Sequence, residues 1–175
     1  MHGKAWRTVL LMAAWGGVAC GGGGSAGPGD PTVTQPGQVT TRCHTADVQA
    51  RVESSSTVAG TGVIVVSLTG TGAGACALEG YAGLQLLDRN GAGVPVQLSR
   101  STDVPIRRVI LPPGRAASFE VRSRPPGGAP CAPVTGARLQ ITLPDELDSL
   151  VVDVAAGGLV ACDGQLTVTA MQARA

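Results

Sequence analysis

The chain has 175 residues, of which 13 are basic and 12 acidic, so its formal net charge at neutral pH is only +1. A balance this even creates no long-range attraction for a phosphate backbone, and nucleic acid is therefore excluded as an expected partner. Aromatic side chains make up 2% of the sequence, so a folded domain must build its core from aliphatic residues.

Residues 1–19 have the three-part layout of a secretory signal. Lys4 and Arg7 precede an apolar stretch, Val9–Ala19, that ends in small residues just before Cys20. This stretch is shorter than the roughly 20 residues that span a bilayer, so we expect it to be cleaved rather than retained. The segment resembles a bacterial lipoprotein signal, which implies that cleavage exposes Cys20 and that Cys20 carries a diacylglycerol.

Gly17 departs from the lipoprotein pattern, because that family usually has leucine three residues before the cysteine. Gly17 and Ala19 together would also suit an ordinary signal peptidase, which accepts small residues at these two positions. Plain secretion without a lipid therefore stays open, as does an uncleaved anchor.

Residues 20–40 are rich in Gly, Pro, Ser and Thr and show no apolar periodicity. Such a segment buries too little surface to offset its ordering entropy, so we predict a flexible tether. Removing residues 1–19 leaves eleven arginines against twelve acidic residues, a net charge of −1. Residues 41–175 are long enough for one domain of ordinary size.

From Thr41 onward, apolar residues recur with period two between Gly and Pro turns, a pattern typical of strands. Turns are predicted at Asn90-Gly91 and at Pro112-Pro113-Gly114. The strands are predicted around these apolar positions: Val63–Leu68; Leu84 and Leu86; Val94, Val96 and Leu98; Ala117, Phe119 and Val121; Leu139, Ile141 and Leu143; Leu150, Val152 and Val154; Leu166, Val168 and Ala170. Roughly seven to nine short strands at this spacing predict an all-β domain, an antiparallel immunoglobulin-like β-sandwich.

The five cysteines become an even set of four if Cys20 carries lipid, as an oxidising compartment favours. Those four, Cys43, Cys76, Cys131 and Cys162, permit three connectivities, and the sequence leaves all of them open. We favour Cys43–Cys76 and Cys131–Cys162, because each pair closes a compact local loop. A zinc site is not expected, because no two cysteines have the close spacing of zinc ligands.

Residues 76–83 have the sequence Cys-Ala-Leu-Glu-Gly-Tyr-Ala-Gly, and a Leu-Pro-Pro-Gly turn follows at residues 111–114. With these motifs and its spaced cysteines, the chain resembles the exported actinobacterial lipoproteins that carry the domain of unknown function DUF4232, over about residues 41–172. Ala82 stands where proline is common, and Gly70 where asparagine often lies. We expect Gly70 to preserve a turn through its tolerance of positive φ. The resemblance implies an extracytoplasmic β-sandwich with two disulfides, and it implies no activity.

Arginines are concentrated in residues 100–124. This segment contains six arginines and two acidic residues, so its local net charge is +4. A functional interpretation is an interaction surface for anionic wall polymers or lipid headgroups. Its candidate residues are Arg107, Arg108, Arg115, Arg122 and Tyr81. The alternative, which we favour from the sequence, is that this basic segment lies near the acidic segment 139–175 and that Tyr81 is a core residue.

No residue pattern identifies an enzyme. His44 is the only histidine after residue 19, and no spacing supplies it with a nucleophile and an orienting group. Asp145, Glu146 and Asp148 could offer oxygen ligands to calcium, but they lack the spacing of a calcium loop. We therefore predict no catalytic residues, no metal and no cofactor.

The sequence as a whole favours a non-catalytic binding or interaction module, held at the outer side of the cell membrane by its N-terminal lipid. Its partner would be an envelope protein or polymer. A small-ligand carrier is the first alternative and requires an apolar cavity between the sheets. A hydrolase of wall material is the second and would depend on His44.

Overall fold

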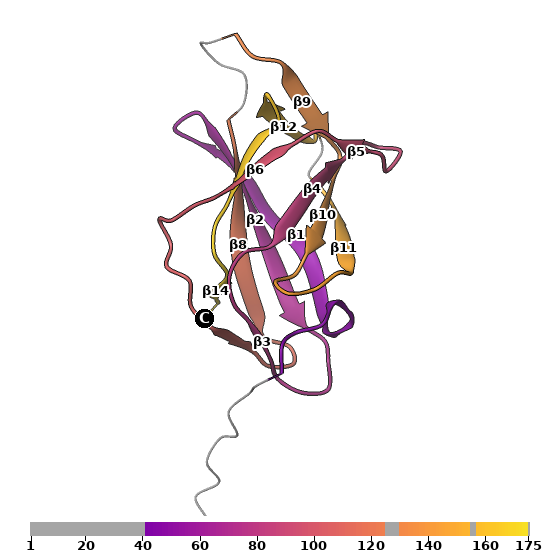
Figure 1. Cartoon of the computed structure of the whole chain (residues 1–175), viewed down its shortest axis with the longest axis vertical. Coiled ribbons are helices and arrows are strands. Elements are labelled where there is room, and N and C mark those ends of the chain that lie inside the picture. Colours follow the sequence, from indigo (N-terminus) through magenta and orange to yellow (C-terminus); the bar gives the residue numbers. More distant parts are fainter. Residues whose placement is uncertain (1–40, 125–129, 155–156, 175) are drawn as a thin grey trace, which may run out of the picture. The chain divides into compact units, whose positions relative to one another are not determined.

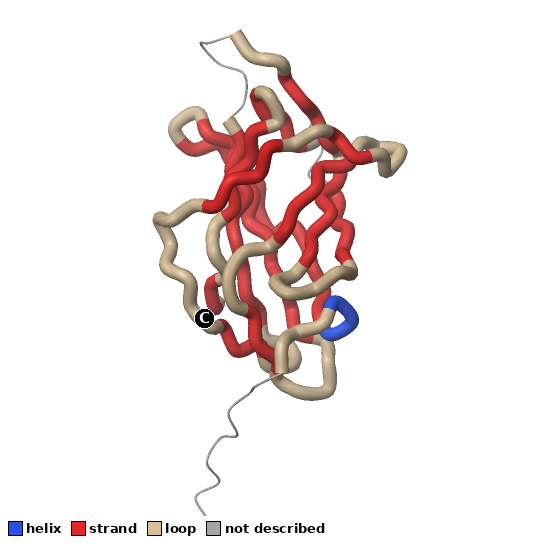
Figure 2. The backbone as a smooth tube through the Cα atoms, viewed as in Figure 1, coloured by secondary structure: helices blue, strands red, loops and turns tan. Residues whose placement is uncertain are grey.

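The computed structural model describes residues 41–124, 130–154 and 157–174. The expected signal at residues 1–19, the lipidation site Cys20 and the tether at residues 20–40 lie outside these residues, so they stay predictions. The described residues form strands and connecting loops with one short 3-10 turn, η1 (Thr45–Asp47), which confirms the all-β prediction (Figure 2). Within these ranges, no helix has the length and apolar character needed to cross a membrane.

The larger sheet has six strands in the order β1-β2-β8-β13-β6, with β14 also paired to β8 (Figure 1). Its strands are β1 (Val48–Val58), β2 (Thr61–Gly70), β6 (Gln97–Arg100), β8 (Ala116–Ser123), β13 (Gln165–Val168) and β14 (Gln172–Ala173). β8 pairs with β2 along one edge and with β13 and β14 along the other, so it is the central strand of this sheet.

A second sheet has four strands in the order β11-β10-β4-β5, and two further pairs join β12 to β9 and β3 to β7. The remaining strands are β3 (Cys76–Leu78), β4 (Gly83–Leu87), β5 (Gly93–Val94), β7 (Val109–Leu111), β9 (Pro133–Gly136), β10 (Arg138–Thr142), β11 (Ser149–Asp153) and β12 (Leu159–Cys162). β3 and β12 lie at opposite ends of the larger sheet (Figure 1).

One aliphatic core lies between the two sheets. Along β8, buried and half-buried residues alternate, so Phe119 and Val121 face the core while Glu120 and Arg122 face away from it. Phe119 belongs to one hydrophobic cluster with residues of both sheets, such as Ile141 of β10. The sandwich-like arrangement is therefore the way in which both sheets bury their apolar sides. We call the opposite side of the larger sheet its outer face.

Three expectations about the strands were wrong in detail. The described residues form fourteen strands rather than seven to nine, because several are pieces of two to four residues that alternation cannot delimit. The strand expected across Val94, Val96 and Leu98 is two strands in different sheets, since Pro95 lacks the N–H that would continue the ladder. One of these pieces, β6, pairs in parallel with β13, an exception to the antiparallel order.

Gly70 serves a different purpose from the one expected. It lies at the end of β2 and is absent from the described residues with positive φ. A Cβ atom at this position would come within 2.6 Å of the carbonyl oxygen of Pro112. Close approach of two backbone segments, rather than a turn conformation, therefore requires glycine here.

Candidate functional site

A polar groove of about 420 Å³ lies on the outer face of the larger sheet. Arg122 of β8 lies opposite Thr167 of β13, and Thr167 lies opposite Ser99 of β6, so strand register places these side chains in one row. The groove is lined by charged and hydroxyl side chains, among them Arg100, Ser101, Asp103, Arg122, Arg124 and Thr167. We call this hollow the Arg122 groove.

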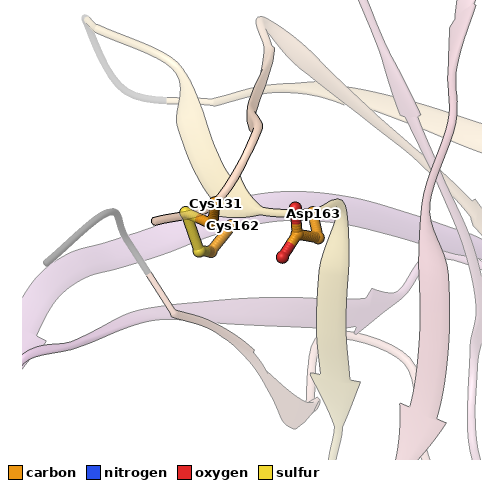
Figure 3. A group of neighbouring side chains, drawn as sticks. All are labelled: Cys131, Cys162 and Asp163. Atoms are coloured by element: carbon orange, nitrogen blue, oxygen red, sulfur yellow. A yellow bond between two sulfur atoms is a disulfide. The ribbon is translucent and has the colours of Figure 1, made fainter. Parts of the chain in front are cut away.

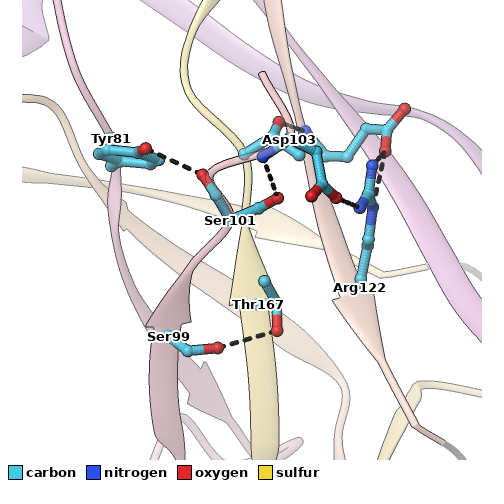
Figure 4. Close-up of polar contacts among 8 residues, drawn as sticks. Tyr81, Ser99, Ser101, Asp103, Arg122 and Thr167 are labelled. Atoms are coloured by element: carbon cyan, nitrogen blue, oxygen red, sulfur yellow. Dashed lines mark hydrogen bonds and ion pairs between the residues drawn. The ribbon is translucent and has the colours of Figure 1, made fainter. Parts of the chain in front are cut away.

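Arg122 donates hydrogen bonds to two carboxylates of the protein (Figure 4). Its Nε and Nη2 atoms donate to Glu120 Oε2 at 3.0 and 2.9 Å, and its Nη1 donates to Asp103 Oδ2 at 2.8 Å. The hydrogen bond to Glu120, followed by the one to Asp103, raises the pKa of Arg122. The hydrogen bond from Arg122 in turn holds the pKa of Asp103 below its usual value. These contacts fasten the segment after β6 onto β8.

Tyr81 contributes to the same region. Its hydroxyl donates to the carbonyl oxygen of Ser101 at 2.9 Å (Figure 4). The guanidinium of Arg100 lies 5.4 Å from the centre of the Tyr81 ring. The ring packs against the core as a half-buried residue. Tyr81 is therefore a core residue with its hydroxyl at the rim, and it positions the backbone that carries Ser101.

The predicted interaction surface is divided in the structure. Arg122 and Tyr81 lie together at the Arg122 groove, whereas Arg107 and Arg108 lie on the exposed segment before β7. Arg115 lines a separate hollow with Arg51 and Arg174.

The disulfides are Cys43–Cys76 and Cys131–Cys162, which confirms the favoured pairing. Asp163 lies beside the second disulfide, and its carboxylate comes within 4.8 Å of both sulfur atoms (Figure 3). Sulfur atoms joined to each other are not thiolate ligands, and Asp163 Oδ1 already accepts the backbone N–H of Ala132 at 2.9 Å. We therefore interpret this group as a turn that is stabilised by the disulfide and by the hydrogen bond to Asp163, rather than as a metal site.

A carboxylate cluster joins the start of the domain to the β10–β11 loop. Glu146 Oε1 lies 3.1 Å from Arg42 Nε and 3.0 Å from His44 Nδ1, and the Glu146 side chain is only 8% exposed. Burial acts to raise the pKa of Glu146, but the Thr45 N–H, His44 and Arg42 together lower it below its ordinary value. The Glu146 carboxylate therefore already has partners within the protein, which argues against its use as a calcium ligand.

A family model described as "Domain of unknown function (DUF4232)" matches residues 43–172. The chain belongs to the DUF4232 family. No curated protein and no solved structure matches the chain. The DUF4232 match begins at Cys43 and includes both disulfides and Tyr81. It also includes every residue that lines the two hollows of the outer face, apart from Arg174.

The predicted interaction surface left out several charged residues that line the outer face of the DUF4232 domain. Among them are Arg51, Arg100, Asp103, Arg124 and Arg174. Arg51 and Arg174 lie far apart in the chain, and only strand register brings them together. Alternation places Arg51, Arg122 and Thr167 away from the core, and this signal could have identified part of the outer face.

Proposed function

We propose that this chain is an exported protein, anchored to the membrane by lipid at Cys20, whose immunoglobulin-like DUF4232 domain binds an anionic polymer of the cell envelope without catalysis. The order of signal, cysteine, tether and domain in the sequence supports the anchored arrangement. Two disulfides support export, because such bonds persist mainly in oxidising compartments.

The observation that carries the binding proposal is the charge of the outer face. Its hollows are lined by six arginines, namely Arg51, Arg100, Arg115, Arg122, Arg124 and Arg174. Glu53 and Asp103 line the same hollows, and Glu120 lines a neighbouring pocket with Arg122, so these three acids leave a net charge of +3. A chain of repeated anionic groups could contact both ends of this face at once, and such multiple contacts strengthen binding.

The two alternatives have less support. A small-ligand carrier requires an apolar cavity between the sheets, whereas the hollows described here are lined by arginines on the outer face. A hydrolase would use His44, and Glu146 gives this histidine an orienting carboxylate. The described contacts of Glu146, however, lead on to Arg42 and to the Thr45 N–H rather than to a hydroxyl nucleophile.

The test is co-sedimentation of the Cys20→Ala chain, which cannot carry the proposed lipid, with isolated cell envelopes over a range of salt concentrations. We expect binding that weakens as salt rises, because salt screens exposed charges beyond about 10 Å at 0.1 M. The double variant Arg115→Gln/Arg124→Gln should lose most of this binding. The matched control, Arg89→Gln/Arg107→Gln, removes the same charge from exposed positions that are not in the two hollows. Equal losses in both variants, or binding indifferent to salt, would contradict the proposal.

A further inference from the structure

A second hollow, of about 250 Å³, lies at the other end of the outer face. It is lined by Arg51 of β1, Ser67 of β2, Arg115 of the turn before β8, and Arg174 after β14, together with Glu53. Register explains the grouping, because Arg51 lies opposite Ser67 and the backbone N–H of Arg174 donates to the carbonyl oxygen of Ala116 at 3.0 Å. We call it the Ser67 hollow.

Ser67 is the unusual member of this group. Its neighbours Val66 and Leu68 face the core, so Ser67 faces outward, yet it is only 1% exposed. Its hydroxyl has no hydrogen-bond partner among the described residues. Buried hydroxyl groups without a partner are rare in folded proteins, because they lose hydrogen bonds to water and gain none. A donor is therefore held at the floor of a hollow with arginines around it.

The arginines differ in how they are used. Arg174 forms an ion pair with Glu53, which lies at a bulge in β1. No hydrogen bond or ion pair of the Arg51 or Arg115 side chain is described in residues 41–124, 130–154 and 157–174. With one acid against three arginines, the hollow has a net charge of +2. Two guanidinium groups are thus available to a ligand.

We propose that the Ser67 hollow binds a phosphate group. Guanidinium groups match the oxygens of phosphate in pairs, and the Ser67 hydroxyl supplies a further donor at the floor. Two free guanidinium groups and a hydroxyl offer more donors than the two oxygens of a carboxylate accept well, whereas a phosphate has enough oxygens for all of them. This inference rests on the proposed function. It identifies phosphate as the anionic group that repeats along the polymer bound by the outer face.

The experiment is a titration of the full-length chain, followed by the backbone amide resonances of Ser67, Gly114 and Arg115. Inorganic phosphate is the first probe, dihexanoyl phosphatidic acid below its micelle concentration is the second, and acetate is the control, all at constant ionic strength. We expect saturable shifts at these amides with phosphate and much weaker binding of acetate. Equal affinity for the two phosphates would identify the free group as the ligand, and at least about tenfold tighter binding of the lipid would identify a headgroup.

Variants separate this site from general surface charge. Arg115→Gln should weaken phosphate binding about tenfold, and Ser67→Ala about fivefold, because each removes one donor to the anion. Arg107→Gln removes the same charge from an exposed position outside the hollow and should leave the affinity unchanged. Shifts that do not saturate, an equal effect of Arg107→Gln and Arg115→Gln, or equal affinity for acetate would overturn the proposal. Envelope binding that persists when phosphate fails would overturn this inference alone and leave the proposed function standing.

Discussion

The two hollows on the outer face contain the same kind of residue in two different states. In the Arg122 groove, the guanidinium of Arg122 donates three hydrogen bonds to Glu120 and Asp103. In the Ser67 hollow, the side chain of Arg115 has no partner among the described residues, and the buried hydroxyl of Ser67 in the same hollow is unpaired. Both arginines lie within the same basic stretch of sequence, at residues 100–124.

This difference teaches that local charge in a sequence does not identify a binding residue. An arginine that already donates hydrogen bonds to two carboxylates of the protein, as Arg122 does, contributes to the fold, and a ligand would have to compete with those carboxylates. An arginine without such partners can bind an anion at once. The comparison predicts that Arg122 affects mainly stability and that Arg115 affects mainly binding.

The largest expected effect comes from the strand that both hollows share. Phe119 of β8 is 1% exposed and lies between the outer-face residues Ser118 and Glu120. Phe119→Ala should lower the free energy of unfolding by about 3–5 kcal/mol, because it leaves a cavity in a closely packed core. Denaturant unfolding measures this, with Ser118→Ala as the control expected within about 0.5 kcal/mol of the wild type. A small effect of Phe119→Ala would contradict a core shared by both hollows.

Each disulfide should stabilise the backbone near one of the two hollows: Cys43–Cys76 near the Ser67 hollow and Cys131–Cys162 near the Arg122 groove. Cys76 lies in β3, which pairs with β7 just before Arg115, whereas the backbone N–H of Cys162 donates to the carbonyl oxygen of Arg124 at 2.7 Å. The bonded cysteines are 33 and 31 residues apart, so the chain-entropy model gives each bond about 3–4 kcal/mol.

We therefore expect Cys43→Ala/Cys76→Ala to lower both stability and phosphate binding. Cys131→Ala/Cys162→Ala should lower stability by a similar amount and spare phosphate binding in the molecules that remain folded. Unfolding curves and phosphate titrations of both double variants measure this. If Cys131→Ala/Cys162→Ala weakened phosphate binding more than Cys43→Ala/Cys76→Ala did, the assignment of each disulfide to its hollow would be wrong.

Arg122→Gln and Arg115→Gln should have opposite effects: the first should lower mainly stability, and the second should lower mainly phosphate affinity. Arg122→Gln breaks a half-buried network of charged hydrogen bonds and should lower the free energy of unfolding by about 1 kcal/mol. Arg115→Gln should change stability by less than about 0.5 kcal/mol, because it removes no described contact. Paired measurements of unfolding and phosphate affinity on both variants test this prediction, which fails if Arg122→Gln weakens phosphate binding more than Arg115→Gln does.

The smallest expected effect concerns pH at the Arg122 groove. The pKa of folded Asp103 lies below its unfolded value of about 3.9, so the contribution of Asp103 to stability is present above that pH. It is lost as the pH falls through the lower folded pKa. Asp103→Asn should therefore flatten the acid end of the stability profile, whereas Asp148→Asn, at an exposed position, should leave the profile unchanged. Identical profiles for Asp103→Asn and the wild type would count against the pairing of Asp103 with Arg122.

The sequence predicted those parts of the fold that depend on local alternation. Ala117, Phe119 and Val121 show the period of a half-buried strand, and β8 follows it along its whole length. The Val94–Leu98 stretch shows the same period, but Pro95 interrupts the ladder and sends its two halves to different sheets. Alternation describes which side of the chain is apolar and does not say where one strand ends.

The outer face could be predicted only in part. Ser67 is polar in a β-branched strand, and nothing local indicates that it is buried. It shares its hollow with Arg51, Arg115 and Arg174, which come from three distant segments. Their positions follow from strand register and from the bulge at Glu53, which are properties of the folded sheet.

The most direct test of the whole account is the intact mass of the chain recovered from the membrane fraction of cells that express it. We predict a chain that begins at Cys20, carries a diacylglycerol on that residue, and holds its four other cysteines in the two disulfides Cys43–Cys76 and Cys131–Cys162. A chain that retains residues 1–19, or one whose four downstream cysteines are free thiols, would contradict it.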